Sequence, residues 1–248
     1  MNLKKIPVLF LFLVGSLFSQ ENTYLPNGEN ELGSWFMYFG TNTIAEKWSI
    51  HTEAQLRYYE TPSNFNQLLL RTGINYHINS NAIVTGGYAF IETDPTFTDY
   101  DVISGDILIN NNSISEHRIF EQFILKNKVW EFYFEHRYRL EQRFIQNNYF
   151  GTNDTQHRAR YRLQVSLPLT DIFFLNFYDE IFLNLQNQAF DQNRLYAALG
   201  INVTENLSVQ LGYLKNHFST VDFDRLQFGI FYNPDLRKII KKKNHRSE

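Results

Sequence analysis

The sequence predicts an all-β fold, an antiparallel up-and-down transmembrane β-barrel of about 10–12 strands. Apolar and polar residues alternate along most of the chain, because successive strand residues face opposite sides of a sheet. Many alternating segments reach or exceed the roughly nine to eleven residues that a tilted membrane strand needs. Tight turns and longer connections also alternate between them, as periplasmic turns and outer loops do in membrane barrels.

The first residues predict a secretory signal peptide over 1–19. Lys4 and Lys5 give a positive start, and an apolar run of about thirteen residues follows, typical of a secretory h-region. No apolar run reaches the length of a transmembrane helix. The chain has no cysteine, so we expect neither a disulfide framework nor a lipid-anchored cysteine at the cleavage point. These features predict export to a bacterial outer membrane.

Period-two alternation defines about eleven strand segments in the barrel domain, 20–232. In the segment 47–59, for example, Trp48, Ile50 and Leu56 fall on one face, opposite Glu53 and Arg57. The predicted strands are 32–40, 47–59, 67–78, 82–91, 115–126, 129–144, 157–169, 173–185, 193–204, 207–216 and 223–232. Bacterial single-chain barrels have an even strand number. Either the segment 32–40 therefore does not span fully, or one boundary is misplaced.

The connections alternate in length. Tight turns are predicted at 79–81, 127–128, 170–171 and 205–206. Longer loops are predicted at 61–66, 92–114, 145–156, 186–191 and 218–222. The loop 92–114 is polar, and whether it folds into the lumen stays open. The tail 233–248 is basic, which is typical of a solvated terminus or of contact with anionic lipid headgroups.

A soluble β-sandwich or lipocalin-like barrel is the alternative fold. It would place the apolar strand face in a core and the charged face in water, and soluble strands usually run only about five or six residues. That fold does not explain why the strands are so long, or why Arg and Glu on one face lie opposite aromatic residues on the other. Trp35, Trp48 and Trp130 lie near predicted strand ends, where the aromatic girdles of a membrane barrel are expected.

The polar face of the strands carries the candidate site. In one interpretation its arginines and glutamates form a hydrogen-bonded network that fills a narrow lumen. In the other, surplus arginine, roughly two to one over glutamate, lines a pore and binds small anions. The candidate lumen-lining residues are Arg57, Arg71, Arg118, Glu131, Glu135, Arg137, Arg139, Glu141, Arg143, Arg158, Arg160, Arg162, Glu180 and Arg194.

Four polar residues occupy the apolar phase instead: Glu121, His136, Gln142 and Asp179. A charge at the bilayer midplane costs a few kcal/mol. We therefore expect either a bulge that reverses the phase or a place near the membrane boundary. The adjacent acidic pair that Asp179 forms with the next residue favours a bulge there.

No catalytic or metal-binding motif is found. The histidines are scattered, without the His-Glu-x-x-His or Gly-x-Ser-x-Gly patterns, and no Cys or His cluster suits a metal. Ser49, His51 and Glu53 share a strand face and have the residue types of a hydrolase site. We expect no enzyme activity, cofactor or metal. The net charge of −3 gives no nucleic-acid footprint.

Several blocks of the sequence resemble the family of the domain of unknown function 2490 (DUF2490). They are W-S-I-H-T-E-A-Q-L-R (48–57), E-H-R-I-F-E-Q (116–122), H-R-Y-R-L-E-Q-R (136–143), R-A-R-Y-R (158–162), Y-D-E-I-F-L-N (178–184), F-D-Q-N-R-L-Y (190–196) and L-G-Y (211–213). The resemblance implies an exported protein similar to outer-membrane barrels. The family has no established activity, so the resemblance assigns no catalytic residue.

Together these features predict a porin-like outer-membrane barrel with an Arg/Glu-lined lumen that passes or binds small anionic solutes. The first alternative is a closed barrel with a structural or envelope-assembly role. The second is a membrane-barrel hydrolase. The expected partners are the lipid bilayer and a small anion, with no nucleic acid. The sequence defines neither the solute nor the oligomeric state.

Overall fold

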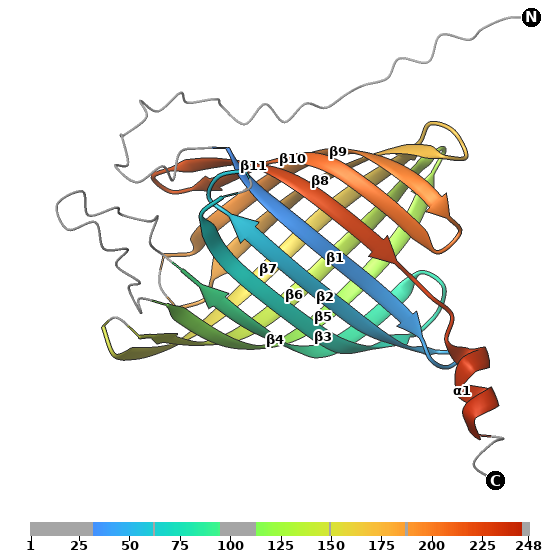
Figure 1. Ribbon diagram of the computed structural model, residues 1–248, viewed down its shortest axis with the longest axis horizontal. Coiled ribbons are helices and arrows are strands. Elements are labelled where there is room, and N and C mark those ends of the chain that lie inside the picture. Colours follow the sequence, from blue (N-terminus) through green and yellow to red (C-terminus); the bar gives the residue numbers. More distant parts are fainter. Residues whose placement is uncertain (1–31, 62, 95–112, 149, 187, 245–248) are drawn as a thin grey trace, which may run out of the picture.

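The computed structural model describes residues 32–61, 63–94, 113–148, 150–186 and 188–244. The predicted signal peptide, 1–19, and most of the predicted loop 92–114 lie outside these residues. The described part forms eleven strands in one closed barrel, followed by a short helix (Figure 1). The elements are β1 (Gly33–Thr43), β2 (Trp48–Tyr58), β3 (Phe65–His77), β4 (Ala82–Thr93), β5 (Ile114–Val129), β6 (Phe132–Asn147), β7 (Thr152–Pro168), β8 (Phe173–Asn184), β9 (Phe190–Thr204), β10 (Leu207–Phe218), β11 (Asp222–Tyr232) and α1 (Arg237–Asn244).

The barrel closes through a parallel pair between β1 and β11, and every other neighbouring pair is antiparallel. This follows from the odd strand number, because the first and last strands of an odd up-and-down series point the same way. The predicted all-β up-and-down barrel is confirmed, and the segment 32–40 belongs to a full strand. The chain differs here from the even-numbered barrels on which the expectation rested.

Aromatic stacking and the C-terminal segment reinforce this parallel seam. Phe36 stacks on Phe228 with ring centroids 5.0 Å apart, on the outer wall. Beyond β11 the chain keeps pairing with the end of β1: Thr43 N donates to Pro234 O at 2.9 Å, and Leu236 N donates to Thr43 O at 2.8 Å. Asp235, between Pro234 and Leu236, is bridged to Thr43. Its carboxyl accepts hydrogen bonds from Arg237, which lower its pKa to about 2.

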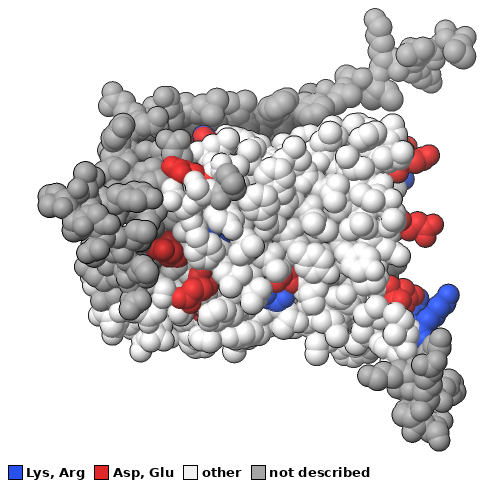
Figure 2. Space-filling view, in the orientation of Figure 1, with Lys and Arg blue, Asp and Glu red and all other residues white. Residues whose placement is uncertain are grey.

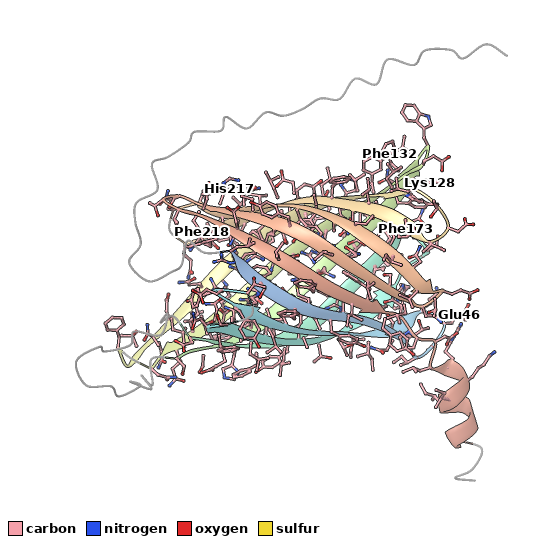
Figure 3. The ribbon with its side chains drawn as sticks, turned by 45° about the horizontal axis from the view of Figure 1, so that its top comes forward. Glu46, Lys128, Phe132, Phe173, His217 and Phe218 are labelled. Atoms are coloured by element: carbon pink, nitrogen blue, oxygen red, sulfur yellow. The ribbon has the colours of Figure 1, made fainter. Side chains whose placement is uncertain are left out.

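The two ends of the barrel differ in their connections. We call the end with the short connections 44–47, 78–81, 130–131, 169–172 and 205–206 the turn end, and α1 lies there too. The other connections lie at the opposite end, the loop end. Figure 3 places Glu46, Lys128 and Phe173 at the turn end, and His217 and Phe218 at the loop end.

Two predicted connections are corrected. The predicted turn 127–128 lies within β5, and the actual turn is at Trp130 and Glu131, with Trp130 in the left-handed region at φ 55°. The predicted loop 145–156 shrinks to 148–151, because β6 runs to Asn147 and β7 begins at Thr152. The backbone ladder needs no apolar side chains, so both strands continue through residues where the alternation has faded.

Apolar side chains dominate the outer wall. Leu70, Ile74, Leu140 and Leu211 are among the large apolar residues exposed on it. On the face in Figure 2, uncharged residues cover most of the wall, and acidic side chains lie near both ends. Among the described residues, no helix has the length and apolar character to span a membrane.

The polar exceptions on the outer wall are paired with one another or with neighbours. Gln142 donates to Glu121 at 3.3 Å, and Asn193 donates to Asp179 at 2.6 Å. The alternation passes through Asp179 without a reversal, and the irregular pairing of β8 with β9 lies further on, between Phe182 and Leu183. The expected bulge at Asp179 is therefore wrong. A carboxylate there is accommodated by a side-chain hydrogen bond.

Candidate functional site

The inward side chains of β2 to β9 form a charged layer across the barrel, which we call the Arg/Glu cluster. Strand register brings like charges directly opposite one another: Arg137 faces Arg162, and Arg139 faces Arg160. Like charges so placed repel. Carboxylates from neighbouring positions must therefore bridge them. The ion-paired members of the cluster are Glu53, Arg71, Glu116, Arg118, Glu135, Arg137, Arg139, Glu141, Arg143, Arg158, Arg160, Arg162 and Glu180.

Glu141 lies at the centre of this cluster. One carboxylate oxygen is 2.7 Å from Arg158 Nη2, and the other is 2.8 Å from Arg160 Nη1. Arg118 Nη1 approaches to 3.4 Å, and Arg139 Nη1 to 3.6 Å. The side chain of Glu141 has 0% of its surface exposed. Charge-assisted hydrogen bonds of this kind are the strong ones, and they offset the cost of burying the carboxylate.

The remaining carboxylates repeat this bridging on a smaller scale. Glu180 on β8 lies 2.6 Å from Arg137 and 2.8 Å from Arg160, so it links β8 to β6 and β7. Glu116 bridges two arginines in the same way: its oxygens lie 2.6 Å from Arg118 and 2.8 Å from Arg143. Glu53 pairs with Arg71 at 2.6 Å, and Glu135 pairs with Arg162 at 2.6 Å.

Aromatic rings also face the lumen and carry guanidinium groups. Phe120 lies between Arg71 and Arg139, whose Cζ atoms are 5.3 and 5.1 Å from its centroid. Phe182 has Arg160 at 4.1 Å and Arg158 at 5.2 Å. Trp35 has Arg57 at 3.8 Å. Each ring supplies a cation–π contact and covers apolar parts of the arginines.

A glycine makes room for one of these rings. A Cβ added to Gly87 would lie 2.6 Å from the ring of Phe120, closer than real Cβ atoms approach their neighbours. Gly87 is the strand partner of Phe120. The inward phenyl ring of Phe120 therefore lies over the backbone of β4 at Gly87. A side chain at Gly87 would displace this ring, which Arg71 and Arg139 contact.

The cluster closes the middle of the barrel. Arg139 and Glu141 point inward, and their side chains are only 2% and 0% exposed. Only other inward side chains can shield them from water. A continuous aqueous channel through this layer would leave them exposed, so the lumen is filled here by charged and aromatic side chains.

Most of the predicted lumen residues occupy the positions expected. Glu131 is the exception, because it lies exposed in the turn between β5 and β6 and outside the Arg/Glu cluster. Trp35 was expected in an outer girdle but is buried in the lumen, with 6% exposed. Phe120 and Phe182 were not expected inside. Their place in the inward phase, between Arg118 and Gln122 and beside Glu180, is the sequence feature that identifies them.

The trio proposed for a hydrolase is rearranged. Ser49 Oγ bonds to His77 Nε2 at 2.8 Å, whereas His51 Nε2 bonds to Glu53 at 3.2 Å. Ser49 is fully buried and accepts a further hydrogen bond from Asn75 at 3.0 Å. The hydroxyl is therefore enclosed by His77 and Asn75 and does not contact His51. Within the described part of the chain, no three His, Asp or Glu side chains gather as a metal site.

The family model described as a protein of unknown function (DUF2490) matches residues 32–227, from the start of β1 into β11. No curated protein matches this chain, and no solved structure matches it either.

Proposed function

Because this chain belongs to the DUF2490 family, whose function is unknown, we propose a function from the barrel itself. It is an outer-membrane barrel that is closed to free diffusion and binds small anionic solutes inside its lumen. The observation that carries this proposal is the composition of the inward layer, in which two arginines, Arg57 and Arg194, lie beside the buried Arg/Glu cluster and form no ion pair among the described residues. The cluster supports closure, and the unmatched positive charge supports anion binding.

The outer wall supports a place in a membrane. Its exposed apolar side chains occur on strand after strand, and strands of eleven to seventeen residues are long enough to cross a bilayer. In an outer membrane the turn end would face the periplasm and the loop end would face outward. Anions would then reach the lumen from one end without crossing the Arg/Glu cluster.

Positive charge in a low-dielectric lumen attracts anions more strongly than the same charge in water. Arg118, Arg158 and Arg160 share the single negative charge of Glu141. Arg57 and Arg194 form no ion pair with a carboxylate among the described residues. The lumen thus combines a cluster of ion-paired arginines, which outnumber their glutamates, with two arginines beside it that have no ion pair, and this surplus of fixed positive charge favours holding an anion over conducting one.

Planar-bilayer recording tests closure. We expect the wild-type barrel to give no steady current above a protein-free bilayer, with insertion verified by its heat-modifiable mobility on a gel. Replacing Arg158, Arg160 and Arg162 with glutamine shortens three inward side chains and removes their ion pairs with Glu135, Glu141 and Glu180, so this variant is expected to conduct. Glu121→Gln on the outer wall is the matched control and should stay silent.

The outcomes separate the alternatives. Steady anion-selective steps from the wild-type protein, shifted in the triple variant, would overturn closure and make the barrel a channel. Silence in both proteins would remove the Arg/Glu cluster as the cause of closure. Should the triple variant fail to fold, Arg160→Gln alone makes the same test with one substitution.

A second candidate function is a closed barrel with a structural or envelope-assembly role. The four arginines within 3.6 Å of Glu141 favour it, because a carboxylate enclosed in this way resembles part of a packed core more than a binding site. The two candidates differ in one measurement. A purely structural barrel would bind neither phosphate nor acetate under conditions in which the wild-type fold is intact.

A further inference from the structure

Two guanidinium groups share the ring of Trp35. The Cζ atom of Arg57 lies 3.8 Å from the ring centroid, and that of Arg194 lies 5.0 Å from it. Arg57 comes from β2, next to β1, whereas Arg194 comes from β9, beyond the parallel seam. Arg194 also lies 4.6 Å from the ring of Phe182. The two positive charges therefore converge on the ring of Trp35 from strands on opposite sides of the seam.

These arginines differ from the members of the Arg/Glu cluster in their partners. Arg57 donates to the amide oxygens of Gln55 and Gln67, at 2.6 Å each. Arg194 donates through Nε to Asn216 at 3.4 Å, and its Nη atoms have no hydrogen-bond partner within the described residues. Neutral amides satisfy some N–H groups but do not balance a charge. Two like charges beside one ring raise the free energy of this site unless an anion joins them.

A third donor lies beside the same ring. Gln227 is the partner of Trp35 across the seam and is 1% exposed. Its Nε2 atom is buried near the side chain of Tyr178 and has no partner at full hydrogen-bond geometry among the described residues. Buried polar groups are nearly always bonded, and an unpaired one costs about 1–3 kcal/mol. Glu180, the strand partner of Arg194, and Glu53 are the carboxylates that act on these two arginines, but both bond to arginines of the Arg/Glu cluster and neither forms an ion pair with Arg57 or Arg194 among the described residues.

We propose that Arg57, Arg194 and Gln227 bind a small oxyanion beside Trp35, in the form of a phosphate or carboxylate group. The inference rests on the proposed function and names the site and ligand class within it. Guanidinium forks match the oxygen spacing of both groups, and a bound anion balances the two charges. A cation would be repelled by both arginines. The indole ring keeps water from one side of the site and orients the forks.

Fluorescence of Trp35 provides the test. The chain has three tryptophans, and Trp48 and Trp130 are exposed outside the lumen. In a Trp48→Phe, Trp130→Phe background, Trp35 is the only tryptophan that reports. We expect inorganic phosphate or acetate, titrated into the protein in detergent at constant ionic strength, to change its emission saturably. The anion whose titration has the lower midpoint concentration, phosphate or acetate, identifies phosphate or carboxylate as the preferred group.

Variants locate the site. Arg194→Gln and Arg57→Gln are each expected to raise the midpoint at least tenfold, because each removes one fork and one charge. Lys215→Gln removes the same charge from the outer wall and should leave the midpoint unchanged. Heat-modifiable mobility confirms that each variant is folded, and Arg194→Lys restores charge without the fork for a second comparison.

The outcomes are decisive for this site. A linear response equal to that of sodium chloride, or equal midpoints in wild type and both arginine variants, would overturn it. If calorimetry then still detects phosphate or acetate binding, the barrel binds anions elsewhere and the proposed function stands without this site. If calorimetry detects none, the site and the anion-binding part of the proposed function fall together, whereas closure is decided separately by the bilayer recordings.

Discussion

Glu141 links arginines that come from β3, β5, β6 and β7. Its distances run from 2.7 Å for Arg158 to 4.0 Å for Arg71, and its side chain has no exposed surface. No hydrocarbon core of the usual kind fills this part of the barrel. One carboxylate therefore sets how closely several positive side chains approach each other.

Replacing Glu141 with glutamine tests this role at the scale of one residue. The change keeps the shape but leaves buried guanidinium groups without their counter-charge, so we expect the free energy of unfolding to fall by about 3–5 kcal/mol. Urea titration of the refolded barrel in detergent, followed by gel mobility, measures it. Glu121→Gln is the control and should change stability by less than about 0.5 kcal/mol. Equal effects of the two substitutions would contradict the central role of Glu141.

Individual residues also show where sequence patterns lose information. The alternation identifies Arg137, Arg139 and Glu141 as inward because the residues between them, Tyr138 and Leu140, belong to the apolar phase of the strand. Around Trp35 both faces of β1 carry aromatic or apolar residues, so the period of two disappears and a girdle position is the natural prediction. The ion pairs themselves are also beyond prediction, because they depend on register and on side chains two strands apart.

At the scale of the elements, the parallel pair of β1 and β11 is the feature that the sequence left open. The individual strands could be predicted because each has its own alternation of apolar and polar residues. Closure is a relation between the two ends of the chain, and no local pattern encodes it. The observed register pairs Tyr38 with Ile230, and both residues lie on the outer wall.

An engineered disulfide checks this register in a chain without native cysteines. Neighbouring strands lie about 4.8 Å apart, within the Cα range of a disulfide. Tyr38→Cys with Ile230→Cys is therefore expected to oxidise readily, and the looped chain should run faster on a non-reducing denaturing gel. Tyr38→Cys with Phe228→Cys moves one cysteine two positions along β11, beyond reach. Preferential oxidation of this second pair would contradict the register.

At the scale of the whole molecule, the barrel reverses the usual distribution of side chains. Its buried layer is charged, and its exposed wall is apolar, as the face in Figure 2 shows. A soluble barrel places these two classes the other way round. The arrangement is stable only if the wall meets an apolar medium, and a bilayer with a hydrocarbon core about 30 Å thick is such a medium.

Insertion into vesicles tests the whole molecule. We expect the urea-unfolded chain, diluted into phospholipid vesicles, to fold, to float with them in a density gradient and to resist extraction by alkaline carbonate, because the apolar wall is buried among acyl chains. Leu140→Arg with Leu211→Arg places charges on that wall. Each charge costs about 2–4 kcal/mol near the midplane, so this variant should insert poorly. Recovery of the wild-type chain as a folded monomer in detergent-free buffer would place the apolar wall in water and contradict a membrane barrel.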